Sequence, residues 1–170
     1  GVLLFSAVQG WKGPLDGLHD FQIGTGAIEV KSTMATEGFP VRIASLDQLD
    51  ESQCPPLFLA ALRFGSTDSG MSLPESVADL RCLLEPDPAA TRLFEQALHQ
   101  AGYLDMQAEN YSRRFSLSEL RVHLVDGEFP RLTPFGIPTA IRRAQYELDL
   151  ALILADNHPL ADVLEQLGVV

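Results

Sequence analysis

Three charged side chains near the start of the chain have the types and the spacing for chemistry on a phosphodiester. Asp20 and the triplet Glu29-Val30-Lys31 are separated by eight residues. Side chains two apart in a strand lie on the same face, so Glu29 and Lys31 project together. Between Asp20 and Glu29, Gly24-Thr25 has glycine at the first central position of a two-residue turn, as a type II′ hairpin requires. That turn sets Asp20 directly opposite Glu29.

Two opposed carboxylates repel each other unless a cation lies between them. Carboxylate oxygens on a rigid hairpin suit Mg²⁺ or Mn²⁺, so the pattern favours Asp20 and Glu29 as metal ligands. A lysine beside the cation, here Lys31, can hold or activate a water aimed at a phosphodiester, while the metal neutralises charge on the phosphate. The alternative is a solvated strand face, because an acid two residues before a lysine often occurs by chance.

The composition excludes several classes of protein. The net charge of −11, from 23 acidic and 12 basic residues, excludes a generally basic protein that coats nucleic acid. Two cysteines, Cys54 and Cys82, cannot form a disulfide framework, a zinc site or an iron–sulfur cluster, which favours the cytoplasm. No apolar run reaches the roughly 18 residues of a membrane span, so we expect no membrane partner.

The remaining signals predict an α/β domain of the α+β type over residues 1–170. Two helices are expected after Pro74 and Pro88, with Asp87 as the cap of the second and Gly102 at its end. A final helix is expected within 157–167, opening with Pro159. The spacing of Ser45 and Gln48 is that of a capping box at the start of a short helical turn. Strand-like runs cover 18–23, 26–31, 41–45, 57–64, 115–117, 120–125 and 141–150.

Short motifs along the chain together resemble the PD-(D/E)XK nuclease-like superfamily and, more narrowly, a bacterial family of PD-(D/E)XK motif proteins. The resemblance implies a restriction-endonuclease-like core, with a mixed central sheet flanked by helices. It also implies that Asp20 and Glu29 bind the metal and that Lys31 is the catalytic lysine. The motifs are Trp11-Lys12-Gly13-Pro14, His19-Asp20-Phe21, Ile28-Glu29-Val30-Lys31-Ser32, 43–49, Leu73-Pro74, Ala101-Gly102-Tyr103, Phe129-Pro130-Arg131-Leu132 and 146–150.

The sequence departs from this family at the first helix, where a Gly-Glu-Leu-Leu segment usually supplies a further acid. Gly1-Val2-Leu3-Leu4-Phe5 contains no acid, and only five residues separate Phe5 from Trp11. We therefore expect a truncated or incomplete N-terminus, and the missing acid weakens the expectation of full activity.

Two other residues are candidate auxiliary groups. Gln48 could position the nucleophile, although its place three residues after Ser45 favours a capping role. Asp16 could be an outer ligand of the metal, although an aspartate between Pro14 and Gly17 is more often a turn residue. The adjacent arginine pairs Arg113, Arg114 and Arg142, Arg143 could contact phosphates of nucleic acid, with solvated surface arginines as the alternative.

The sequence predicts a metal-dependent nuclease that hydrolyses phosphodiester bonds in nucleic acid, with DNA as the favoured substrate. The resemblance alone adds a bacterial restriction or phage-defence system with its protein partners. The competing hypothesis is an inactive domain that keeps the nuclease fold and serves as an interaction module in a larger complex. The charge of −11 favours this alternative, because binding a polyanion usually needs a basic surface.

Overall fold

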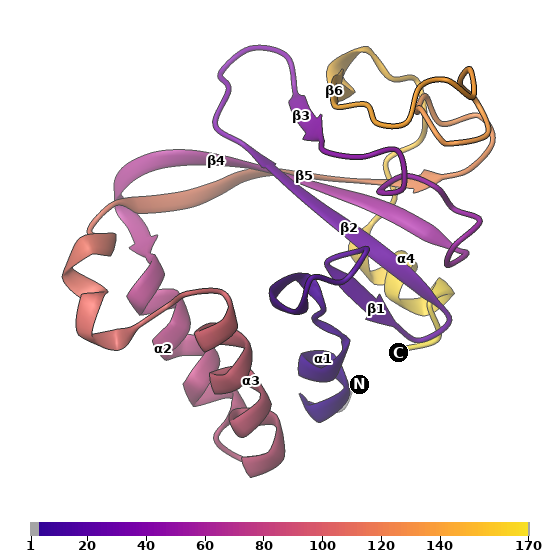
Figure 1. The fold of residues 1–170 in the computed structure, drawn as a ribbon. Coiled ribbons are helices and arrows are strands. Elements are labelled where there is room, and N and C mark those ends of the chain that lie inside the picture. Colours follow the sequence, from indigo (N-terminus) through magenta and orange to yellow (C-terminus); the bar gives the residue numbers. More distant parts are fainter. Residues whose placement is uncertain (1–3, 170) are drawn as a thin grey trace.

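A four-stranded mixed sheet forms the centre of the computed structural model, which describes residues 4–169 (Figure 1). Its strand order is β1-β2-β4-β5, with β1 antiparallel to β2, β2 parallel to β4 and β4 antiparallel to β5. A smaller antiparallel sheet pairs β3 with β6. The strands are β1 (Phe21–Ile23), β2 (Gly26–Thr33), β3 (Pro40–Ile43), β4 (Leu57–Ser72), β5 (Arg114–Val125) and β6 (Tyr146–Asp149).

The helices begin where the sequence offers caps. Ser72 and Glu75 form a complete capping box at the start of α2, and the Asp87 carboxylate accepts hydrogen bonds from the first turn of α3. Gly102, with φ of +82°, follows α3. The helices are α1 (Leu4–Gly10), α2 (Leu73–Leu84), α3 (Pro88–Gln100) and α4 (Leu160–Gln166), with short 3₁₀ turns η1 (Gly13–Leu15), η2 (Asp105–Tyr111) and η3 (Leu150–Leu152).

The two faces of the central sheet have different covers (Figure 1). On one face, Ala27, Leu59 and Ala61 pack with residues of β3 and with Leu150. On the other face, alternate residues of the same strands, such as Ile28 and Phe58, pack with α4. Since side chains alternate along a strand, Glu29 and Lys31 lie on the Ala27 face of β2, beneath the small sheet.

The fold class is the expected one, a mixed α/β architecture consistent with a restriction-endonuclease-like core. Several element bounds were wrong. The predicted strand over 141–150 is reduced to β6, the runs 115–117 and 120–125 are one continuous strand, and the strand from Leu57 extends to Ser72. No helical turn follows Ser45, because residues 45–49 form bends and a turn.

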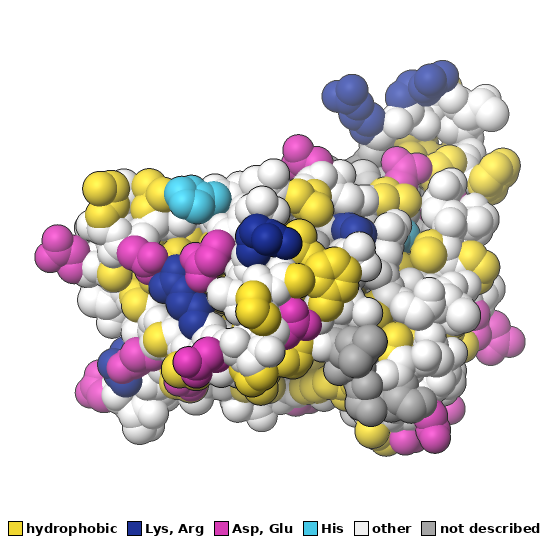
Figure 2. Space-filling model, turned by 90° about the horizontal axis from the view of Figure 1, so that it is seen from below, with side chains coloured by type: hydrophobic (Ala, Val, Ile, Leu, Met, Phe, Trp, Pro, Cys, Tyr) yellow, Lys and Arg dark blue, Asp and Glu magenta, His cyan; other side chains and the backbone are white. Residues whose placement is uncertain are grey.

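None of the described helices is long and apolar enough to cross a bilayer. Figure 2 views the molecule from below and shows hydrophobic, acidic and basic side chains interspersed, with basic side chains projecting at one end. A broad basic surface is therefore missing from this face of the described chain.

Candidate functional site

The β1–β2 hairpin has the predicted register. Ile23 pairs with Gly26 and Phe21 with Ile28. Gly24 has φ of +60°, whereas Thr25 has a negative φ, as a type II′ turn requires. A side chain at Gly24 would lie 1.8 Å from the backbone oxygen of Leu167, which follows α4, so glycine is required by the packing as well as by the turn.

Asp20 lies just before β1, at the edge of β2. Its Oδ2 accepts a hydrogen bond from the backbone N–H of Val30 at 2.8 Å. Its backbone oxygen accepts hydrogen bonds from the N–H groups of Lys12 and Gly13, at 2.7 and 3.1 Å. A Cβ at Gly13 would lie 2.7 Å from Asp20 Oδ1, so a side chain there would displace the Asp20 carboxylate. These contacts hold the Asp20 carboxylate beside Glu29 and Val30, the first residues of β2 that do not pair with β1.

Glu29 is buried beside Asp20, with only 2% of its surface exposed. Its Oε1 accepts a hydrogen bond from Lys31 Nζ at 2.5 Å, and the Lys31 side chain is 16% exposed. Burial raises the pKa of Glu29, the Lys31 ammonium opposes that effect, and the charge on Asp20 adds to the rise. The three predicted residues therefore form one cluster, in which the lysine is the cation beside a buried carboxylate.

Gln48 joins this cluster from the loop after β3. Its Oε1 accepts hydrogen bonds from Lys31 Nζ at 3.3 Å and from the backbone N–H of Ala44 at 2.8 Å. The expectation that Gln48 caps a helix begun by Ser45 was wrong, because no helix forms there. One amide oxygen instead ties the lysine to the 44–48 loop.

Asp16 is an exposed turn residue, as in the alternative interpretation of the sequence. It has a left-handed φ of +55° at the end of η1, a conformation that aspartate tolerates better than most residues. The backbone N–H of Gly17 closes the loop on the carbonyl of Lys12.

The four arginines lie in three different settings. Arg114 pairs with Glu75 and donates to the carbonyl of Gly70, so its guanidinium is already engaged. Arg113 lies over the ring of Phe115, with its Cζ 5.0 Å from the ring centroid. Arg142 and Arg143 are exposed and line a groove of about 580 Å³ together with residues 44–47.

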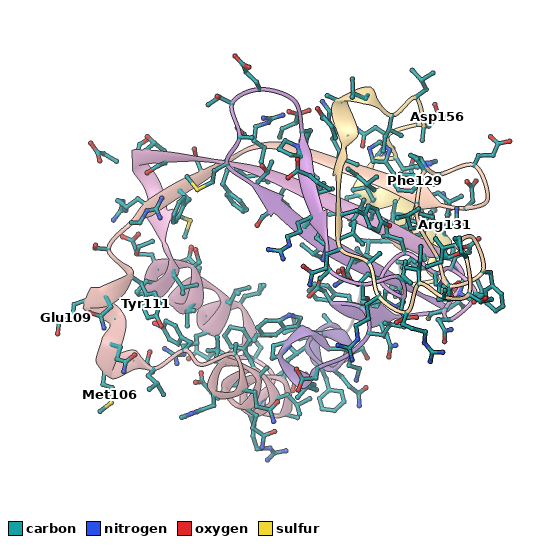
Figure 3. The ribbon with its side chains drawn as sticks, turned by 45° about the horizontal axis from the view of Figure 1, so that its top comes forward. Met106, Glu109, Tyr111, Phe129, Arg131 and Asp156 are labelled. Carbon is teal, nitrogen blue, oxygen red and sulfur yellow. The ribbon has the colours of Figure 1, made fainter. Side chains whose placement is uncertain are left out.

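The loop that leads to these last two arginines is braced near its start. Arg131 donates to the carbonyls of Asp126 and Phe129 and pairs with Glu51. Figure 3 labels Phe129 and Arg131 on this loop, far from η2, whose Met106, Glu109 and Tyr111 mark the other end of the molecule. Arg113 follows η2 closely in the chain. The arginines that could contact nucleic acid therefore lie at opposite ends of the molecule.

Two buried polar residues next to the cluster have no role in the predictions from the sequence. His19, 1% exposed, precedes Asp20, and Asp50, 3% exposed, follows Gln48 by two residues. Burial lowers the pKa of His19, while the charges of Asp20 and Asp50 oppose that effect. Neither ring nitrogen of His19 has a hydrogen-bond partner among the described residues. For His19, the available signal was its position directly before Asp20. Asp50 lies in an irregular loop, where no periodic pattern of apolar residues indicates which side chains are buried.

The donor chemistry of Asp20 and Glu29 fits a divalent cation, but the set is small. Within residues 4–169, no three His, Cys, Asp or Glu side chains lie close enough together to hold one ion. Helix α1 contributes no acid, as its sequence LFSAVQG shows. Mg²⁺ and Mn²⁺ accept carboxylate oxygens, and Mg²⁺ commonly keeps several waters. The two carboxylates could therefore hold such an ion only with water or a substrate oxygen completing its coordination.

A mixed sheet whose hairpin carries Asp20, Glu29 and Lys31 together is the arrangement of the PD-(D/E)XK class, with its restriction-endonuclease-like fold. The chain belongs to the family described as "Putative PD-(D/E)XK family member" (DUF4420), whose model matches residues 4–151. No curated protein and no solved structure matched the chain. The resemblance seen in the sequence is thus confirmed at the level of family and fold.

Proposed function

We propose that this protein is a metal-dependent nuclease that hydrolyses phosphodiester bonds in nucleic acid, with DNA as its favoured substrate. The observation that carries the proposal is the convergence of Asp20, Glu29 and Lys31 at one edge of β2. Membership in a PD-(D/E)XK family supports it, because that fold class contains nucleases.

Each residue of the cluster has a distinct role in this proposal. Asp20 and Glu29 would hold Mg²⁺ or Mn²⁺, which when bound supplies charge neutralisation at the phosphate and a more acidic water. Lys31 would orient the attacking water through its Nζ. Gln48 acts as a positioning residue, since its amide oxygen accepts a hydrogen bond from that Nζ at 3.3 Å. The pKa of Glu29 is raised by burial, so Lys31 also helps to keep the carboxylate ionised.

The groove beside the 44–47 loop supplies a path for the substrate. Ala44 lines this groove and also donates its backbone N–H to Gln48 Oε1. The groove therefore adjoins the residue that accepts a hydrogen bond from Lys31. Arg142 and Arg143 line the same groove and are available for phosphate contacts. Arg114 is less suited to this role, because Glu75 already neutralises it. With a net charge of −11, we expect weak binding that depends on these few arginines.

The biological setting is part of the proposal. We infer a cytoplasmic protein, and a role in a bacterial restriction or phage-defence system with protein partners, from the family resemblance and from the two cysteines.

A second function, that of a catalytically inactive interaction module, is favoured by one observation. Glu29 is almost fully buried and already paired with a cation, the Lys31 ammonium. A carboxylate neutralised in this way is a poorer ligand for an added metal than a free one. In that case the ion pair would be a structural remnant of a nuclease site.

Cleavage of plasmid and single-stranded DNA in the presence of Mn²⁺ distinguishes the two functions. We expect the parent protein to cut and Asp20→Ala to be inactive. Asp16→Asn is the matched control, because it changes a nearby exposed carboxylate that contributes only to a turn. Equal cleavage by the parent protein and Asp20→Ala, or none by the parent, would contradict the nuclease proposal.

A further inference from the structure

An apolar pocket of about 450 Å³ lies at the end of β2, close to the proposed site. It is formed by the last residues of β2, by the β4–β5 pair and by the start of α2. Its walls are Ser32, Thr33, Met34, Phe64, Met71, Leu73, Ser76 and Phe115. Three of these large side chains are substantially exposed: Met34 at 47%, Met71 at 42% and Leu73 at 44%.

Both the pocket and the Asp20–Glu29–Lys31 cluster contain residues of β2 that follow the β1 ladder, where one edge of β2 is free. The β1 ladder ends at Ile28, and no strand of the described chain pairs with that edge beyond it. Thr33 follows Lys31 by two residues, about 7 Å along a strand. Phe64 lies on the opposite face of the sheet from Lys31, so a chain molecule that crosses the free edge can contact both places.

The backbone of Phe115 is tightly packed in the pocket wall. It pairs with both Ser66 and Met71, on either side of an irregularity in β4. The backbone of Phe115 passes Gly70 so closely that a Cβ there would lie 2.4 Å from the Phe115 oxygen. Arg114, next in the chain, donates to the Gly70 carbonyl at 2.9 Å. The backbone that carries the aromatic ring is therefore closely packed in the pocket wall.

The charge of this pocket differs from that of the rest of the molecule. Three larger cavities among the described residues each have at least one carboxylate in their walls, whereas this wall contains none. The nearest acid in α2, Glu75, is neutralised by Arg114. At the rim, Arg113 lies over the Phe115 ring and contacts Met34 Sδ at 3.9 Å. An apolar pocket with hydroxyl groups in its wall and a cation at its rim suits a flat ligand that has an apolar face, polar edges and an attached anion.

We propose that this pocket binds one unstacked nucleobase of the substrate strand and that Arg113 binds the adjoining phosphate. The proposal rests on the proposed function and narrows its substrate class to single-stranded or locally unpaired nucleic acid. A nucleobase presents its flat faces to Phe115 and the methionines, while Ser32, Thr33 and Ser76 can hydrogen-bond to its edges. Duplex DNA keeps its bases stacked and paired, so it has no base to place there without unstacking.

Fluorescence anisotropy with labelled oligonucleotides in EDTA tests the pocket without requiring cleavage. We expect the parent protein to bind a single strand more tightly than a duplex of equal length. Phe115→Ala should weaken single-strand binding about 5- to 150-fold, the range for loss of one base–aromatic stack. Arg113→Ala should weaken binding and reduce its dependence on salt.

Two further variants make the test specific. Leu117→Ala is the matched control, since Leu117 is an exposed apolar residue of the same strand, 51% exposed and outside the pocket wall. Met71→Glu places a carboxylate at the exposed rim and should abolish the preference for single strands. Thermal melting checks that each variant is folded.

Equal affinities for the parent protein, Phe115→Ala and Met71→Glu would overturn the pocket proposal, even if the parent cuts DNA at the Asp20 site. Such a result leaves the nuclease proposal intact. Absence of nucleic-acid binding by the parent protein, together with absence of cleavage, would overturn both.

Discussion

Replacing Lys31 with methionine isolates the effect of its ammonium group on the buried Glu29. Methionine keeps most of the apolar stem, so packing is largely preserved. The variant removes the cation 2.5 Å from Glu29 Oε1, which opposes the effect of burial on the pKa of Glu29. The pKa of Glu29 then rises further, and the folded protein keeps a proton there that the unfolded chain has lost.

The size of the stability loss follows from the extra proton that the folded state of Lys31→Met holds on Glu29. Where the folded state holds one proton more than the unfolded state, the free energy of unfolding falls by about 1.4 kcal/mol for each pH unit. The fall begins near the ordinary glutamate pKa of 4.5. At pH 7 the loss from this titration therefore cannot exceed about 3.4 kcal/mol, because protonation of Glu29 limits it. For a chain of this size a loss at that limit lowers Tm by about 7–14 °C.

The assay is urea unfolding of the parent protein and Lys31→Met at several pH values from 5 to 8. We expect the stability difference between them to grow with pH. The double variant Lys31→Met with Glu29→Gln should remove this growth, since no titrating carboxyl remains at position 29. Lys12→Met, which changes the only other lysine, is the control: its stability difference from the parent protein should not change with pH. A difference independent of pH, or one that persists in the double variant, would refute the coupling of Lys31 to Glu29.

Three other outcomes are expected. About 10 mM Mn²⁺ should raise the Tm of the parent protein by a few degrees in a thermal melt, but not that of Asp20→Ala, because only a metal bound to the native state stabilises it. Gly13→Ala should reduce cleavage, because the added Cβ would lie 2.7 Å from Asp20 Oδ1; cleavage equal to that of the parent protein would show that Asp20 need not be held there. Ser72→Ala should lower the free energy of unfolding by about 1 kcal/mol through loss of the α2 capping box, and an unchanged urea midpoint would contradict this.

The hairpin could be predicted from the sequence because its signals are local. Glycine at the first turn position determines the register, and alternation along the strand places Glu29 and Lys31 on one face. The helix caps at Ser72 and Asp87 are local in the same sense. These short-range constraints were enough to place the three main residues of the candidate site together.

Contacts between distant segments were not accessible in the same way. Gln48 reaches Lys31 across 17 residues from an irregular loop, and no periodic pattern indicates that contact. Arg114 and Glu75, 39 residues apart, pair because β5 passes beside the start of α2. The strand expected over 141–150 failed for a related reason. Its alternation is real, but only Tyr146–Asp149 has a partner strand, β3, with which to pair.

The central claim is that Asp20 and Glu29 hold a divalent cation at which nucleic acid is cut. The most direct test is the initial rate of single-stranded DNA cleavage as a function of Mn²⁺ concentration, for the parent protein and Glu29→Gln. We expect the rate of the parent protein to rise and saturate at about millimolar Mn²⁺, as for a site with few protein ligands, and Glu29→Gln to stay at background at every concentration. A parent rate that does not depend on Mn²⁺, or a Glu29→Gln rate equal to that of the parent, would contradict the claim.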